Sequence, residues 1–122
     1  MPRAAVQAIH DRQIARHGGA PGLRDGTLLE SALARPMNRF AYGETDLHAL
    51  ATAYAFGVAK AHAFVDGNKR TAFVTCLTFL RANGAQGTFD QAEIVRMMEG
   101  LASGLVPEPD FTTWLARGTG AM

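Results

Sequence analysis

The sequence predicts an all-α protein. Apolar residues recur at spacings of three and four along several segments, whereas the alternating pattern of a half-buried strand is scarce. Residues that cap or end helices lie at the borders of these segments. A chain of 122 residues has the length of one domain. We therefore expect a single compact bundle over residues 1–122, with about six helices and one short flap segment.

The first two helices are predicted from their borders. One is expected over residues 4–17, ended by the glycine pair 18–19. Asp25 and Thr27 both offer N-cap chemistry for the next helix, and Thr27 with Glu30 fits a capping box. This helix is expected to end at Pro36, because the residue before a proline avoids the α conformation.

The segment 37–45 has no helical period and is expected to be a loop. Within it, residues 40–45 are expected to form the short hairpin or flap. A loop of this size between helices can carry function, although simple connection is the commoner role.

Four further helices follow. Residues 46–63 carry a one-sided apolar stripe. Residues 68–83 are apolar almost all round and are closed by Gly84, which predicts the buried centre of the bundle. Asp90 and Asp110 are expected to cap the last two helices.

Composition excludes several classes of protein. The formal net charge of +1 argues against a broad electrostatic grip on nucleic acid. A single cysteine, Cys76, allows no internal disulfide and suits a reducing compartment. No apolar run is long enough to span a membrane, and no secretory signal is visible. We therefore expect a cytoplasmic protein with no membrane contact.

The junction of the two central helices carries an anion-binding pattern. The first turn of a helix has unpaired backbone N–H groups and the positive end of the helix dipole. Gly67 and Asn68 precede two cations, Lys69 and Arg70, at this position. Basic side chains are unfavourable at a helix N-terminus, and a bound anion would relieve that conflict. The four residues 67–70 therefore predict a phosphate cradle.

His62 and Asp66 add reactive groups beside this cradle. Histidine can take up a proton near neutral pH. A carboxylate can hold Mg²⁺ together with substrate phosphates. A base, a metal ligand and a phosphate cradle within nine residues are the parts that phosphoryl or nucleotidyl transfer requires.

Each residue also has an ordinary structural explanation. A histidine at a helix end, an Asp-Gly turn, an N-cap asparagine and a Lys-Arg pair on a solvated face are all common. Only the combination is specific. A Walker loop is excluded because its first glycine is absent and the preceding element is a helix. A zinc site is not expected, because the four histidines are scattered and no His-Glu-x-x-His or cysteine pair exists.

The nine residues 62–70 read His-x-Phe-x-Asp-Gly-Asn-Lys-Arg and resemble the signature of the Fic/Doc family. Lys69 stands where typical Fic AMP-transferases have glycine. A lysine at this position is the mark of the Doc (death-on-curing) branch. Further resemblance to Doc sequences lies in residues 8–11, 18–25, 71–73 and 78–84.

The resemblance implies a compact helical toxin that binds ATP with Mg²⁺ at this loop. Doc toxins are kinases that pass the γ-phosphate to a threonine of elongation factor Tu and stop translation. His62 would then be the general base, Asp66 would hold Mg²⁺ or orient the base, and residues 67–70 would form the anion hole. Lys69 and Arg70 would act in catalysis as well as in binding.

Other positions follow from the same resemblance. Phe64 would anchor the loop in the core, and residues 40–45 would be the flap that docks the target chain. Lys60, a further phosphate-binding candidate, replaces an arginine and so lacks its bidentate fork. Val74 replaces a polar asparagine one turn beyond Arg70.

No self-inhibitory [ST]-x-x-x-E-[GN] helix is present, so restraint is expected from a separate antitoxin whose disordered segment folds as a helix into a groove. Two alternatives stay open. One is transfer of AMP or another nucleotide part by the same fold. The other is a catalytically weak module that mainly binds an antitoxin.

Overall fold

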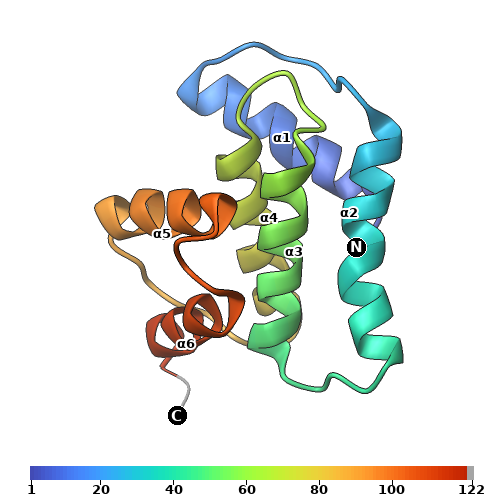
Figure 1. Ribbon diagram of the computed structural model, residues 1–122. Coiled ribbons are helices and arrows are strands. Elements are labelled where there is room, and N and C mark those ends of the chain that lie inside the picture. Colours follow the sequence, from blue (N-terminus) through green and yellow to red (C-terminus); the bar gives the residue numbers. More distant parts are fainter. Residues whose placement is uncertain (121–122) are drawn as a thin grey trace.

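The computed structural model describes residues 1–120, which form six α-helices and no strand (Figure 1). The helices are α1 (Arg3–His17), α2 (Gly26–Ala41), α3 (Leu47–Ala61), α4 (Asn68–Ala82), α5 (Gln91–Ser103) and α6 (Glu108–Gly118). The all-α prediction is confirmed. Within this part of the chain, no helix is long and apolar enough to cross a membrane.

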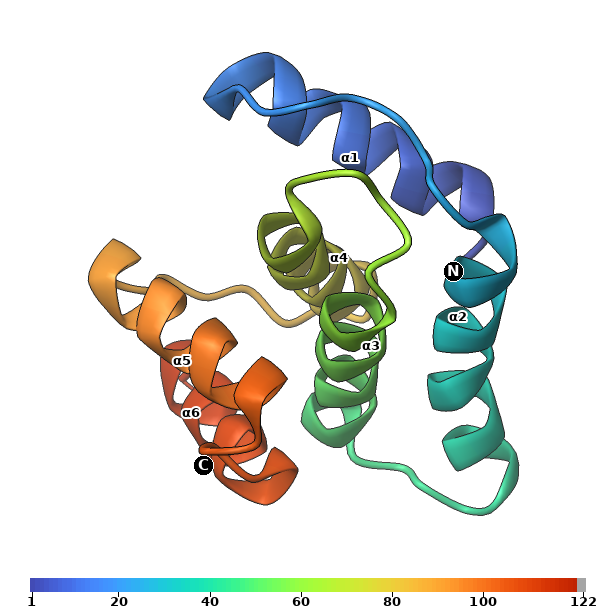
Figure 2. The ribbon, with the colours of Figure 1, turned by 45° about the horizontal axis from the view of Figure 1, so that its top comes forward.

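Helix α3, and not α4, is the centre of the bundle. Figure 2 shows α3 between α2 on one side and the α5–α6 pair on the other, and α3 also packs against α4. Nine of the fifteen α3 residues are buried, against six in α4. The expectation of a one-sided stripe on α3 is therefore wrong. Alanine and glycine are frequent in α3, and such small residues let neighbouring helices approach on several sides.

Helix α2 is longer than predicted. It passes through Pro36 and ends at Ala41, so the loop before α3 is only residues 42–46. A proline inside a helix removes one backbone hydrogen bond. Here the proline ring is buried, and this burial offsets part of that loss. The prediction that α2 ends at Pro36 is wrong.

The predicted capping box and one predicted cap are wrong, whereas two other predicted helix starts are confirmed. Of the two predicted candidates, Asp25 caps α2 by accepting the N–H groups of Thr27 and Leu28, so no Thr27–Glu30 capping box forms. Helix α6 begins after Pro107, which places Asp110 inside the first turn. Helix α4 begins at Asn68, as predicted, so this asparagine is its first residue and not an N-cap.

Two further borders are confirmed. Asp90 accepts the N–H of Glu93 and caps α5. Gly84 follows α4 with φ +88, a left-handed conformation that glycine adopts at low cost.

The C-terminal helices are part of the core. Phe111 and Leu115 of α6 are buried. Trp114 packs against Phe73 and Phe89, with ring centroids 5.9 and 4.8 Å apart, and donates its Nε1–H to Glu93 at 2.7 Å. These contacts fasten α6 to α4 and α5.

Candidate active site

The motif loop joins the end of α3 to the start of α4, at the top of Figure 1. His62 follows α3 with φ 49 and ψ 40. It is the single non-glycine residue with positive φ among residues 1–120. This conformation is strained for a residue with a Cβ, and such strain is typical of functional positions. The reversed backbone at His62 turns the chain sharply out of α3 and into the loop.

The segment 18–25 supports the backbone of this loop. The N–H groups of Arg24 and Asp25 both donate to the carbonyl of Ala63, at 2.7 and 3.0 Å. The N–H of Val65 donates to the carbonyl of Gly22 at 3.1 Å. An isolated antiparallel bridge pairs Leu23 with Phe64.

The segment 40–45 does not lie beside the motif. Figure 1 shows the α2–α3 connection at the bottom of the bundle and the motif loop at the top. Fifteen residues of α3 separate them, a helix length of about 22 Å. The expectation that residues 40–45 form a flap at the site is therefore wrong, and the adjacent segment is 18–25. The flap was expected from the resemblance, and the length of α3 is what separates residues 40–45 from the motif.

Two side chains hold the loop from within. Asn68 turns back over it, accepting the N–H of Phe64 at 3.1 Å and donating to the carbonyl of Phe64 at 3.0 Å. His10 of α1 lies 2.7 Å, through Nε2, from the carbonyl oxygen of Asp66 and stacks on the Phe64 ring. Phe64 is buried, as expected for an anchor. The sequence singled out Asn68 as an anion ligand and did not assign His10 to the site.

Asp66 is exposed and its carboxylate is partly engaged. Oδ1 accepts the N–H of Gly67 at 2.8 Å, and Oδ2 accepts the N–H of Ala20 at 3.3 Å. No cluster of three or more metal-ligating side chains exists among residues 1–120. Mg²⁺ needs only one or two carboxylates when substrate phosphates complete its shell. The exposed Asp66 oxygens therefore fit that ion.

Lys69 and Arg70 leave their charges available. Both are exposed in the first turn of α4. Neither has a carboxylate within ion-pair distance in the described part of the chain. Arg70 donates one bond to the carbonyl of Gly18 at 3.1 Å, which steadies the guanidinium without neutralising it. Two unpaired cations at a helix N-terminus make a strong anion site.

A cavity of about 420 Å³ collects these groups. Its motif side is formed by His62 and residues 65–70, and its opposite wall by four residues of α5. Those four are Ile94, Val95, Met98 and Glu99. The sequence predicted α5 but not this wall, because the same apolar spacing is typical of core packing. The exposed side chain of Val95 is the feature that marks the wall, and only the structure reveals it.

Comparison with known proteins agrees with this geometry. The Fic/DOC family model matches residues 1–80, which include the whole motif loop. The chain belongs to the Fic/Doc family. It is 43% identical to "Protein kinase doc" of Escherichia phage P1 over 98 residues, covering 80% of this chain and 77% of that protein. It is 44% identical to "Toxin Doc" of Mycolicibacterium smegmatis over 72 residues, covering 57% and 55% of the two chains. Both relatives are Doc proteins, which confirms the branch indicated by Lys69.

Two positions of this Fic/Doc chain lie outside the cavity. Lys60 is exposed, and its ammonium is 5.9 Å from the centre of the Phe56 ring. Val74, half-buried in α4, does not line the cavity either. The structure thus brings His62 and residues 66–70 together and leaves Lys60 apart from them.

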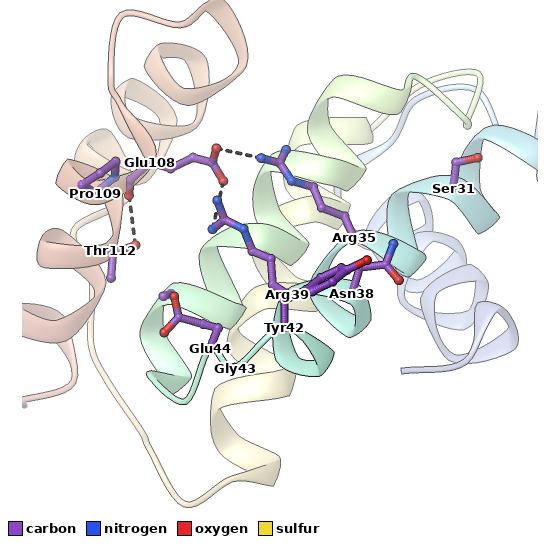
Figure 3. A pocket seen from close by; sticks show the side chains of 11 residues that line it. Ser31, Arg35, Asn38, Arg39, Tyr42, Gly43, Glu44, Glu108, Pro109 and Thr112 are labelled. Atoms are coloured by element: carbon purple, nitrogen blue, oxygen red, sulfur yellow. Dashed lines mark hydrogen bonds and ion pairs between the residues drawn. The ribbon is translucent and has the colours of Figure 1, made fainter.

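A larger cavity, of about 970 Å³, lies at the other end of the Fic/Doc bundle, between α2 and α6 (Figure 3). Figure 3 shows Arg35 and Arg39 of α2 reaching Glu108 of α6, at 2.8 and 3.7 Å. None of the motif residues lines it. The smaller cavity is the better active-site candidate because the titratable and cationic groups converge there, whereas in the larger one the arginines already share a carboxylate.

Proposed function

We propose that this Doc-family protein is a kinase that transfers the γ-phosphate of ATP to a serine or threonine hydroxyl of a target protein such as elongation factor Tu. The observation that carries the proposal is the convergence of His62, Asp66 and two unpaired cations on one cavity. Phosphoryl transfer depends mainly on positioning and on electrostatic stabilisation of the phosphate oxygens. The name of the phage relative supports the same reaction.

The chemistry follows from the placement of each group. The target hydroxyl oxygen attacks the γ-phosphorus, a new P–O bond forms, and the bond to the β,γ-bridging oxygen breaks so that ADP leaves. The hydroxyl proton passes to neutral His62, the general base. Lys69, Arg70 and the N–H groups at the start of α4 stabilise the charge on the transferred group.

Mg²⁺, when bound, would neutralise charge on the phosphates and hold them in line for transfer. Asp66 is the residue proposed to hold it, and Glu99 brings a second carboxylate to the same cavity. The remaining metal ligands would be phosphate oxygens and water.

The name "Toxin Doc" for one relative supports two further proposals. The transfer would block translation when elongation factor Tu is the target. A separate antitoxin would restrain the toxin by folding a disordered segment into a groove. An apolar groove of about 340 Å³ between α2, α3 and α4, which the exposed Met37 and Phe40 help to line, offers a surface of the required kind.

Isotope position in ATP tests the reaction. The protein is incubated with elongation factor Tu and Mg²⁺ in the presence of ATP labelled at either the α- or the γ-phosphate. We expect label on the target from γ-labelled ATP alone. Label from α-labelled ATP would instead demonstrate AMP transfer. Absence of both, with an intact target, would favour a module that only binds its antitoxin.

A further inference from the structure

His10 is a buried histidine that belongs to no predicted site. It lies in the middle of α1, fifty-six residues from its partner in the motif loop, and is 1% exposed. Its Nε2 is 2.7 Å from the carbonyl oxygen of Asp66. A carbonyl only accepts, so Nε2 carries a proton and donates it. The ring also stacks on Phe64, with centroids 3.9 Å apart and planes inclined by 10°.

This hydrogen bond fixes the orientation of one peptide unit. The carbonyl of Asp66 and the N–H of Gly67 belong to the same planar trans unit, so they point in opposite directions. The carbonyl points to the buried His10. The N–H therefore points outward, where the exposed Asp66 carboxylate accepts it at 2.8 Å.

Gly67 makes the orientation of this unit easy to reverse. Its φ is +73, and glycine passes between positive and negative φ at little cost. A reversed unit would turn the Asp66 carbonyl oxygen toward the cavity, where its negative end would repel a phosphate. The local sequence does not select the productive orientation, so a contact from elsewhere has to do so.

We propose that His10 is a positioning residue that holds the Asp66–Gly67 peptide unit with its N–H on the cavity side, where a phosphate oxygen would replace the Asp66 carboxylate as its acceptor. The hydrogen bond to the Asp66 carbonyl sets the orientation, and the stack on Phe64 holds the ring in place. This role rests on the phosphate-transfer function proposed above.

Two variants separate the hydrogen bond from the packing. His10→Phe keeps a stacked ring and removes the donor. His10→Gln removes the ring and keeps a donor at the position of Nε2. His48→Phe is the matched control, because His48 is a largely buried histidine at the opposite end of the bundle that bonds Thr119. Circular dichroism checks that each variant folds.

The probes are inorganic pyrophosphate, titrated by calorimetry, and the amide resonance of Gly67 in ¹⁵N-labelled protein. We expect His10→Phe to weaken pyrophosphate binding about tenfold, the scale of one lost charge-assisted hydrogen bond, and to shift the Gly67 amide. His10→Gln should restore most of the affinity and the resonance position. His48→Phe should change neither.

A His10→Phe protein with wild-type pyrophosphate affinity and an unshifted Gly67 amide would overturn the proposal. An equal loss of pyrophosphate affinity in His10→Phe and His10→Gln would also overturn it, because the packing of the ring and not the donated hydrogen bond would then matter. A wild-type protein that binds pyrophosphate but transfers no phosphate would refute the kinase and leave the His10 test intact. If the wild type binds no pyrophosphate, the phosphate cradle fails, and an unshifted Gly67 amide in His10→Phe would refute the positioning role separately.

Discussion

His62 combines a reactive side chain with a strained backbone. A left-handed conformation costs a residue with a Cβ about 1–2 kcal/mol, a cost that glycine avoids. The rest of the loop offsets this strain, because the carbonyl of His62 accepts a bond from Arg24 and the next carbonyl accepts two. The strain thus places the imidazole at the cavity instead of along the axis of α3.

A pair of variants separates chemistry from strain. His62→Ala and His62→Gly should both lose transfer activity, by about a hundredfold or more, because both lack the base. His62→Gly should nevertheless be more stable than His62→Ala, by about 0.5–1 kcal/mol, because the left-handed cost exceeds the entropy cost of glycine. Urea unfolding of the two proteins gives the difference. The control is His17→Ala, at an exposed histidine of α1, which should retain wild-type transfer activity and wild-type stability. Near-wild-type transfer by His62→Ala would refute the base assignment.

At the scale of residues, the sequence predicted that the motif residues lie together, but it did not predict which distant residues contact them. His62, Asp66 and residues 67–70 lie within nine positions, so chain connectivity alone keeps them together. His10 and Ile94 reach the site only through tertiary packing. In the sequence, a histidine or a branched apolar residue inside a helix has the appearance of ordinary core.

Among the elements, α2 and α3 pack tightly against each other at Gly57. A Cβ added at Gly57 of α3 would lie 2.9 Å from the backbone oxygen of Ala32. Pro36 has no N–H to donate to that oxygen, which is therefore left to face α3. Pro36, which led to the wrong prediction of the α2 boundary, thus lies one turn beyond this contact.

Gly57→Ala tests the balance between helix propensity and packing. Alanine is the better helix former by about 1 kcal/mol. Crowding in a packed core typically costs about 1–3 kcal/mol, and a backbone oxygen has little freedom to move. We expect net destabilisation, measured by thermal unfolding. Gly26→Ala is the control, because its Cβ would meet only the flexible end of Arg3. A Gly57→Ala protein as stable as wild type would show that α2 shifts freely.

Over the whole molecule, Cys76 reports on the core. The thiol is fully buried in α4, and burial raises its pKa far above the usual range. Thiolate, the reactive form, is therefore scarce in the folded protein. We expect alkylation by iodoacetamide at neutral pH to proceed only through unfolding, so its rate should rise in parallel with urea-induced unfolding. Rapid alkylation without denaturant would show that the core opens locally around α4.

The overall helical class was predictable because it depends on the repetition of apolar residues over many turns. The arrangement was not, and the choice of α4 as the centre shows why. Large apolar residues on α4 suggested deep burial, but the small residues of α3 allow four other helices to pack around it. Size complementarity between helices is a property of pairs of elements and does not appear in either segment alone.

The wall contributed by α5 lies beyond residue 80, where the family match ends. The motif residues of the cavity thus lie in one length of chain, and the wall that faces them lies in another. Without this wall, the motif residues would lie at an open face. Exchanging α5 between Doc relatives should therefore change which molecules fit the cavity, and it should change the carboxylate of Glu99 beside the motif as well.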